Sequence, residues 1–268
     1  MASGGLFAIR RDKGELPMEN ASLVGLSRQV ALSRELDVIA NNIANMTTTG
    51  FKADGSLFEE YLSSSARAAG TGGRVSYVRD RGIWHDMSQG PLERTGNPLD
   101  IAIEGQGFLT VQTPRGQRYT RNGALQINAN GQLVTSEGDA VLGASGPITF
   151  QPNDRQISIG RDGTISVREG TNKTDTQRGK LDVVTFANPQ ALQKDGGSTF
   201  RPVGNAAPQP APQASIVQGA VEKSNVRGVV EMSRMIEITR AYTQIASMLQ
   251  QQDSQSQTAI DKLAEVPN

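Results

Sequence analysis

The sequence predicts an α+β protein in which long N- and C-terminal coiled-coil-like helices flank a central antiparallel β domain, either a sandwich or a distorted barrel. Two observations predict this class. Near both chain ends, apolar residues recur at steps of three and four, and between them they recur at steps of two among turn dipeptides. With 268 residues, the chain is long enough for one or two domains with an apolar core.

The N-terminal helix is expected at residues 18–50. It follows a leader over residues 1–17, whose glycines and mixed charges without periodicity predict disorder. The main apolar stripe of the helix alternates steps of four and three, as a coiled-coil seam does, and consists of Leu32, Leu36, Ile39, Ile43 and Met46. A second stripe of Leu23, Leu26 and Val30 lies on roughly the opposite side. Two opposed stripes predict contact with two different partners.

The C-terminal helix is expected within residues 222–268. Its seam steps by three and four without interruption and begins with Met235, Ile238, Tyr242, Ile245 and Leu249. Met232 and Ile236 belong to a shorter stripe beside this seam. Such a helix measures about 57 Å, whereas a compact globule of the whole chain has a radius of gyration of about 18 Å. The helix is therefore expected to extend beyond its own domain, and its seam needs another helix to cover it.

The central β domain is expected at residues 95–200, where Asn122-Gly123, Asn130-Gly131 and Asp162-Gly163 predict tight turns between antiparallel strands. Residues 51–94 are expected to connect the first helix to this domain, with a short helix at residues 57–62. The proline-rich residues 201–221 are expected to form an extended tether that returns the chain to the last helix.

The composition excludes several classes of partner. The 27 Lys and Arg residues balance 27 Asp and Glu residues, so there is no basic field for nucleic acid. The absence of cysteine removes disulfides and zinc thiolates. The longest strictly apolar run, residues 6–9, is far shorter than a membrane span or the core of a cleavable signal peptide. We therefore expect no nucleic acid, no membrane insertion and no cleavable signal.

Catalytic chemistry is not expected either. His85 is the only histidine, and no nucleophile elbow or fixed spacing accompanies it, so a packed or solvent-facing side chain is the simpler interpretation. Gly105-Gln106-Gly107 lacks the third glycine and the helix of a phosphate-binding loop, and is interpreted as a turn. We expect no catalytic, cofactor-binding or metal-binding residues, and the protein is predicted not to be an enzyme.

The candidate functional residues are therefore those of the helix seams. Apolar stripes usually pack against the core of their own chain, but a helix longer than its domain cannot bury its whole length there. Pairing of the two helices within one chain covers one stripe of each and leaves the other stripes for neighbouring molecules. The expected assembly interface comprises Leu32, Leu36, Ile39, Ile43, Met46, Met232, Met235, Ile236, Ile238, Tyr242, Ile245 and Leu249.

Several stretches resemble a known family. Residues 36–45, Leu-Asp-Val-Ile-Ala-Asn-Asn-Ile-Ala-Asn, followed by Thr-Thr-Gly-Phe-Lys at residues 48–52, resemble the N-terminal signature of flagellar basal-body rod and hook proteins. Residues 90–103, 119–123 and 131–135 are similar to the β domain of that family. Ser224-Asn225-Val226 and Arg240-Ala241-Tyr242 resemble its C-terminal signature. The resemblance extends from Met18 to Leu263.

Within the family, residues 58–62 and 75–82 are similar to proximal-rod members, and a distal-rod subunit is the alternative. One departure is Thr47, which stands where an asparagine is usual. The resemblance implies a structural subunit of the rod that crosses the periplasm in the flagellar basal body. It also implies export by the flagellar export apparatus, assembly with other proximal and distal rod proteins, and torque transmission. A secreted coiled-coil adhesin and a periplasmic hydrolase using His85 are the alternatives from other classes.

Overall fold

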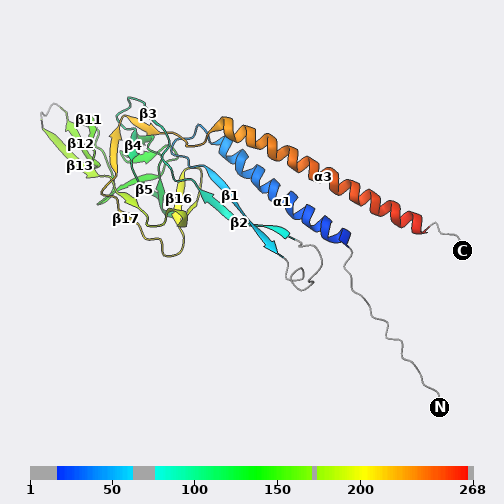
Figure 1. Ribbon diagram of the computed structural model, residues 1–268. Coiled ribbons are helices and arrows are strands. Elements are labelled where there is room, and N and C mark those ends of the chain that lie inside the picture. Colours follow the sequence, from blue (N-terminus) through cyan, green and yellow to red (C-terminus); the bar gives the residue numbers. More distant parts are fainter. Residues whose placement is uncertain (1–16, 63–75, 171–173, 265–268) are drawn as a thin grey trace, which may run out of the picture. The chain divides into compact units, whose positions relative to one another are not determined.

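The computed structural model describes residues 17–62, 76–170 and 174–264, which fall into two compact units (Figure 1). The first, here called the helical unit, contains Met1–Leu36, Ser56–Gly82 and Ile236–Asn268. The second, here called the β unit, contains Asp37–Gly55 and Ile83–Met235. Most of both helices therefore belongs to the helical unit, while the end of the first helix and the start of the last belong to the β unit. The expected leader lies outside the described residues except for Pro17.

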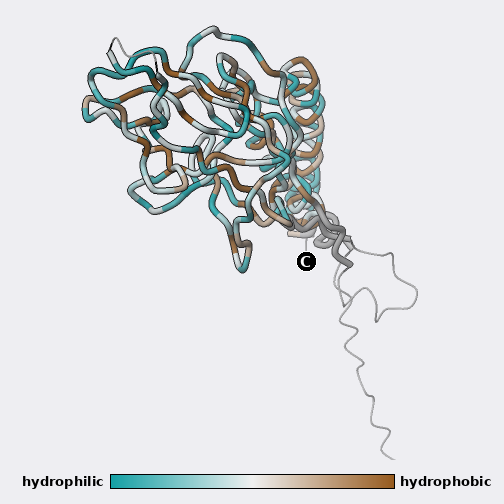
Figure 2. The backbone as a smooth tube through the Cα atoms, turned by 90° about the vertical axis from the view of Figure 1, so that its left-hand side faces the viewer, coloured by the Kyte–Doolittle hydropathy of each residue, from teal (hydrophilic) through white to brown (hydrophobic). Residues whose placement is uncertain are grey.

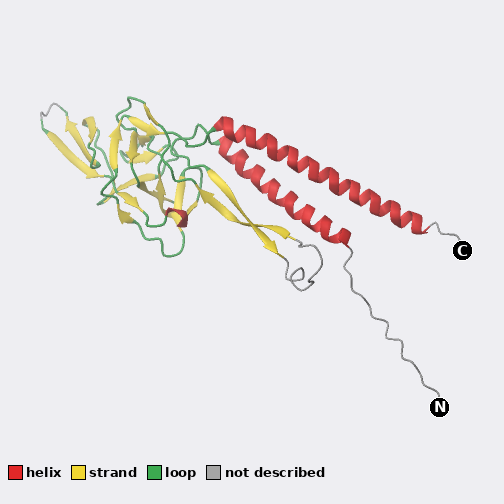
Figure 3. Cartoon of the chain, in the orientation of Figure 1, coloured by secondary structure: helices red, strands yellow, loops and turns green. Residues whose placement is uncertain are grey.

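The two long helices are α1 (Pro17–Ala44) and α3 (Gly228–Ala264), shown in red in Figure 3. Both are shorter than the expected ranges 18–50 and 222–268. Helix α1 ends at Ala44 because the next amides turn tightly: Met46 N donates to Ile43 O, and Thr48 N donates to Asn45 O. Helix α3 begins only after Ser224, whose hydroxyl accepts a hydrogen bond from Val226 N in a local turn.

A hairpin of β1 (Asp54–Leu62) and β2 (Ser76–His85) follows α1. The expected short helix at residues 57–62 is wrong, because these residues lie in β1. A short apolar run is ambiguous between helix and strand, and here the two aromatic residues Phe58 and Tyr61 favour a strand. The pairing partner β2 lies beyond a long connection, so the run itself does not reveal it.

The main sheet of the β unit has the order β15, β16, β6, β5, β9, β8, β7, in which each described pairing is antiparallel. Three strands lie off this path: β10 pairs with β9, β14 pairs with β5, and β17 pairs with β14. The bounds along the sheet are β15 (Leu192–Lys194), β16 (Thr199–Pro202), β6 (Gly116–Thr120), β5 (Phe108–Thr113), β9 (Ala140–Gly143), β8 (Leu133–Thr135), β7 (Leu125–Ile127), β10 (Gly146–Pro147), β14 (Val183–Thr185) and β17 (Gln209–Pro210).

Smaller antiparallel sheets complete the β unit. Their strands are β11 (Asp154–Ile159), β12 (Thr164–Glu169) and β13 (Asp175–Lys180), then β4 (Ile101–Glu104) with β18 (Ser215–Gln218), and β3 (Leu92–Arg94) with β19 (Ala220–Glu222). The antiparallel prediction is confirmed, whereas the choice between sandwich and barrel stays a prediction. Residues 201–221 do not form a free tether, because β17 and β18 pair with strands of the expected β domain, and β19 pairs with β3 in the segment before it.

The predicted turns are partly confirmed. Asn130-Gly131 connects the paired strands β7 and β8, and Asp162-Gly163 connects β11 and β12. Asn122-Gly123 does not close a hairpin, because the flanking strands β6 and β7 do not pair with each other. Gly123 O instead accepts a hydrogen bond from Ile101 N, the first residue of β4. A local dipeptide cannot reveal that its flanking strands pair with distant segments.

Two apolar clusters form the core of the β unit, and Figure 2 shows hydrophobic stretches along its strands. The larger cluster contains Ile101, Leu133, Ile165 and Val167, which are almost completely buried. The smaller is mainly aromatic: Phe108, Tyr119, Phe186 and Phe200 pack edge to face. The strands that pack in these clusters hold the β unit together. The polar residues of this unit that lie near the ends of the two helices are thereby fixed in place. A short 3₁₀ helix, η1 (Pro189–Ala191), precedes β15.

Candidate assembly interface and its polar junction

In the helical unit, α1 and α3 approach closely at Gly25. A Cβ atom at this position would lie 2.8 Å from Leu249 Cδ2, so the leucine fills the space left by the missing side chain. The predicted seam residues of this unit are half-buried, apart from Ile236: Leu32, Leu36, Ile238, Tyr242, Ile245 and Leu249. This seam is therefore covered only in part by the described residues of its own chain.

In the β unit, the ends of the same helices run antiparallel. Gly228 at the start of α3 lies beside Met46, just after α1 ends, and Asn42 Nδ2 donates to Glu231 Oε2 at 3.5 Å. Ile39 is the only fully buried member of the predicted interface, with 1% of its surface exposed. Ile43 and Met235 are half-buried, whereas Met46 is exposed. Later residues of α1 therefore lie beside earlier residues of α3.

Both helices also carry apolar side chains that face solvent. On α1 these are Leu23, Leu26 and Val30, the stripe opposite the seam, and Leu26 is 53% exposed. On α3, Val229 is 81% exposed and is followed at helical spacing by the exposed Met232 and Ile236. Val230, Met248 and Ile260 are exposed as well. We call the exposed residues Leu23, Leu26 and Val30 with Val229, Met232 and Ile236 the outward faces. Apolar stripes in water mark surfaces that bind partners.

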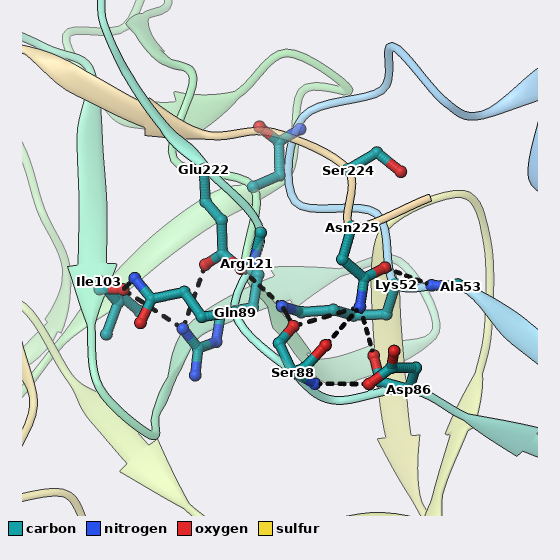
Figure 4. Close-up of polar contacts among 12 residues, drawn as sticks. Lys52, Ala53, Asp86, Ser88, Gln89, Ile103, Arg121, Glu222, Ser224 and Asn225 are labelled. Atoms are coloured by element: carbon teal, nitrogen blue, oxygen red, sulfur yellow. Dashed lines mark hydrogen bonds and ion pairs between the residues drawn. The ribbon is translucent and has the colours of Figure 1, made fainter. Parts of the chain in front are cut away.

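Three charged side chains are buried together in the β unit, near the end of α1 and the start of α3 (Figure 4). Glu222, the last residue of β19, accepts a hydrogen bond from Lys52 Nζ at 2.5 Å and another from Arg121 Nη1 at 3.1 Å. The side chains of Lys52 and Glu222 are 0% exposed and that of Arg121 is 4% exposed. We call these three residues the junction triad. Its charges come from the segment after α1, from the loop after β6 and from the segment before α3.

The electrostatics of the triad follow from burial. Burial lowers the pKa of Lys52 below its ordinary value, although the carboxylate of Glu222 opposes this shift. Burial likewise lowers the pKa of Arg121, again against the opposing effect of Glu222. One carboxylate thus serves two cations that have lost their hydration. Removing it would leave two unpaired charges in the protein interior, which is strongly destabilising.

Further hydrogen bonds to Glu222 bring the backbone of neighbouring segments to the triad. Gly90 N donates to Glu222 Oε1, and Gly50 N donates to Glu222 O at 2.7 Å. Gly50 has φ +70°, and a Cβ atom there would lie 2.4 Å from Asn122 N. Only glycine fits this left-handed position against another backbone. The segment after α1 is therefore fixed against the loop after β6.

Two asparagine side chains connect the helix ends to the residues at the start and the end of the hairpin. Asn42, near the end of α1, accepts from Asp54 N at 2.9 Å and donates to Asp54 O at 2.8 Å, as a neighbouring strand would. Asn225, just before α3, accepts from Ala53 N and donates to Asp86 O and to Ser88 O, as Figure 4 shows. Both helix ends are thereby attached to the residues on which the hairpin begins and ends.

His85 belongs to a second polar group beside the triad. Its Nδ1 lies 2.6 Å from Asp54 Oδ1, and Lys194 Nζ donates to Asp54 Oδ2 at 2.9 Å. Burial raises the pKa of Asp54, but the hydrogen bonds from His85 and Lys194 outweigh it and lower the pKa below its ordinary value. The His85 ring packs edge to face on Phe200 and is buried. Of the two interpretations of His85, these contacts agree with a packed side chain and not with a solvent-facing one.

The junction triad and both asparagines were not predicted as functional residues. Lys52, Arg121 and Asn225 lie within the stretches that carry the family resemblance, and this was the available signal. The resemblance does not indicate that Lys52 and Arg121 meet Glu222 in space. Their burial also could not be anticipated, because lysine and arginine are usually exposed.

In the described part of the chain, no three His, Cys, Asp or Glu side chains gather in a way that could hold a metal ion. Among the described helices, none combines the length and apolar character that crossing a membrane requires. The apolar faces of the helices and the polar junction are thus the features that call for a function.

Comparison with known proteins places three segments in related families. Residues 23–52 match the family described as flagella basal body rod protein, and residues 217–262 match the flagellar basal body rod FlgEFG protein C-terminal family. Residues 102–167 match the flagellar hook protein FlgE/F/G D1 domain. The first and second of these segments cover most of α1 and α3, together with the residues that follow α1 and those that precede α3.

Full-length relatives give the same result. The flagellar basal-body rod protein FlgF of Caulobacter vibrioides is 39% identical over 250 residues, covering 93% of this chain and 100% of the relative. FlgF of Mesorhizobium japonicum is 36% identical, covering 92% and 98%. The flagellar basal-body rod protein FlgG of Buchnera aphidicola is 34% identical, covering 77% and 85%. These FlgF relatives match more of the chain, at higher identity, than this FlgG relative does.

Proposed function

Because the chain belongs to the flagellar basal-body rod protein family, we propose that it is a proximal-rod subunit that assembles with other rod proteins through its terminal helices. The observation that carries this proposal is the pair of outward faces, which are apolar, helical and uncovered within the described chain. A distal-rod subunit is the second candidate, supported by the FlgG relative. The proposed role is structural and involves no catalysis.

The helix pair supplies the mechanism. Continuing the antiparallel register of Met46 with Gly228 puts Leu36 beside Ile238 and Leu32 beside Tyr242. We propose that this inner seam forms a coiled-coil-like pair within the chain, since its members are half-buried. The outward faces, which include the exposed Met232 and Ile236, pack on helices of neighbouring subunits. Met46 is exposed as well and is available for the same contacts.

Assembly then follows from the hydrophobic effect. Each contact that covers an outward face removes apolar surface from water, at about 25 cal/mol per Å². Repetition of one contact around a helical array stabilises the whole rod, which transmits torque through packed helices. The proposed location is the periplasmic part of the flagellar basal body, reached through the flagellar export apparatus.

The test separates the outward face from the inner seam. Leu26→Asp changes an exposed side chain, so the purified protein should keep the helix content and melting temperature of the wild type. In cells, the same variant should give truncated rods and no swimming, because a charge cannot be buried unpaired in the subunit contact. Ser33→Asp, also at an exposed position of α1, is the matched control and should swim.

Ile238→Asp, on the half-buried inner seam, should differ by also lowering the helix content of the purified protein. Electron micrographs of basal bodies and soft-agar swimming report on assembly, and circular dichroism reports on the isolated chain. Complete rods built from the Leu26→Asp variant would refute the role of the outward face on α1.

A further inference from the structure

The junction triad combines two properties that point beyond static support. All three charged side chains are buried, and their charges derive from chain segments that are far apart in the sequence. Glu222 alone accepts hydrogen bonds from Gly50, Lys52, Gly90 and Arg121. A buried charge without its partners is costly, so these segments dock together or not at all.

From this arrangement we propose that Glu222 is a positioning residue that makes the order of both helix ends conditional on the folded β unit. Its carboxylate requires Lys52 from the segment after α1 and Arg121 from the loop after β6 at the same time. It lies on β19, close to the start of α3. The helix ends can therefore adopt their paired arrangement only when β19 with Glu222 and the loop with Arg121 are already in place.

The two asparagines connect the segments around the triad to the helices by hydrogen bonds. Asn225 is three residues from Glu222, and its side chain fixes Ala53 and Ser88. Asn42 fixes Asp54, the residue after Ala53, and also contacts Glu231 in the first turn of α3. Hydrogen bonds and short stretches of backbone thus connect the triad to both helix ends within the β unit. Opening the triad should release both ends together.

The consequence deepens the proposed function and rests on it for its biological meaning. A chain whose β unit has not folded would hold its helix ends without a fixed register, so its seam would not be matched to that of a neighbour. Assembly would then accept only subunits whose β unit is complete. The physical claim concerns the isolated protein, so it can fail while the rod-subunit proposal stands.

Amide hydrogen exchange, read by mass spectrometry on the purified full-length chain, tests the claim. In the wild type, helix residues 37–44 and 228–235 should exchange as slowly as the core strands β8 and β12, because both open only with the whole β unit. In Glu222→Gln, the loss of global stability speeds exchange throughout the β unit, and these helix segments should in addition exchange at least about tenfold faster than β8 and β12. Glu93→Gln, at an exposed residue of β3 whose carboxylate pairs with Lys223, is the matched control.

A second variant covers the case in which Glu222→Gln does not fold. Asn225→Ala keeps all three charges and removes only the hydrogen bonds to Ala53, Asp86 and Ser88. It should show the same local loss of protection in the helix ends. The proposal is overturned if the wild-type helix ends exchange much faster than the core strands, or if the variants speed exchange equally throughout the β unit.

Discussion

Replacing Asp54 by Asn should destabilise the protein in a way that depends strongly on pH. The carboxylate accepts hydrogen bonds from His85 and Lys194, and its side chain is only 10% exposed. Asparagine keeps the shape and one acceptor oxygen but removes the charge. The backbone of Asp54, which pairs with Asn42, is unaffected by the substitution. The variant therefore isolates the contribution of one negative charge at the root of the hairpin.

The expected magnitude follows from the two contacts. A hydrogen bond to a charged group contributes about 1.5–3 kcal/mol, so two of them give at most about 3–6 kcal/mol. Water reaches part of this group, and screening reduces the value, so we expect a loss of about 2–4 kcal/mol at pH 7. Asp175→Asn is the matched control. Both side chains of the Asp175–Arg168 ion pair are exposed, so the pair should contribute less than about 1 kcal/mol.

The sign of the pH dependence is fixed by the direction of the shift. The folded pKa of Asp54 lies below its ordinary value, so its stabilisation is complete above the unfolded pKa, near pH 4, and is lost as the pH falls through the folded pKa. The difference between wild type and Asp54→Asn should therefore shrink between about pH 5 and pH 2. Below that range, His85 and Lys194 face a neutral side chain in either protein.

The assay is urea unfolding at a series of pH values, followed by the fluorescence of Trp84, the only tryptophan, and by circular dichroism. Trp84 lies over Gly55, directly after Asp54, so it reports on this region. A difference in unfolding free energy that stays constant from pH 7 to pH 2 would show that the charge of Asp54 does not contribute, and the reasoning would be refuted.

Three further substitutions test other parts of the structure by the same urea unfolding. Glu222→Gln should lose about 3–5 kcal/mol because it leaves two buried cations unpaired, whereas the exposed Glu93→Gln should lose less than about 1 kcal/mol; equal losses would contradict the buried-triad account. Gly50→Ala should lose about 2–5 kcal/mol from left-handed strain and backbone overlap, and an unchanged unfolding midpoint would contradict the close approach. Gln156→Gly should gain up to about 1 kcal/mol, because Gln156 has φ +47° in the bulge of β11, and a lower unfolding midpoint would contradict strain at this position.

The helices could be predicted from the sequence because their signal is local. Ile39, Ile238 and Tyr242 follow a helical period that needs no knowledge of the partner. Their ends could not be placed as well, because α1 stops where Met46 and Thr48 turn, and such turns compete closely with one more helical turn. The strand at residues 54–62 was missed for a related reason: only pairing with β2 decides its conformation.

The polar junction could not be predicted because it depends on long-range pairing. Lys52 and Glu222 are 170 residues apart in the sequence, and Arg121 and Glu222 are 101 apart. No local pattern distinguishes these charges from the solvated ones that surround them. The resemblance to a family marks the segments in which they lie, but not the geometry that joins them. For His85, the sequence left a packed and a solvent-facing side chain open, and only the structure shows that it is buried.

The apolar seam and the polar junction have different tasks. A seam of regularly spaced apolar residues attracts another helix but specifies its register weakly, since a slip of one heptad restores similar contacts. Such a slip moves one helix by about 10 Å along the other. It would separate Asn42 from Glu231 and draw Asn225 away from Ala53, and the buried charges of Lys52 and Arg121 would lose Glu222. Buried ion pairs add little net stability compared with apolar packing, but they penalise wrong arrangements severely. We therefore propose that the seam supplies the attraction between the helices and that the junction determines which register is stable.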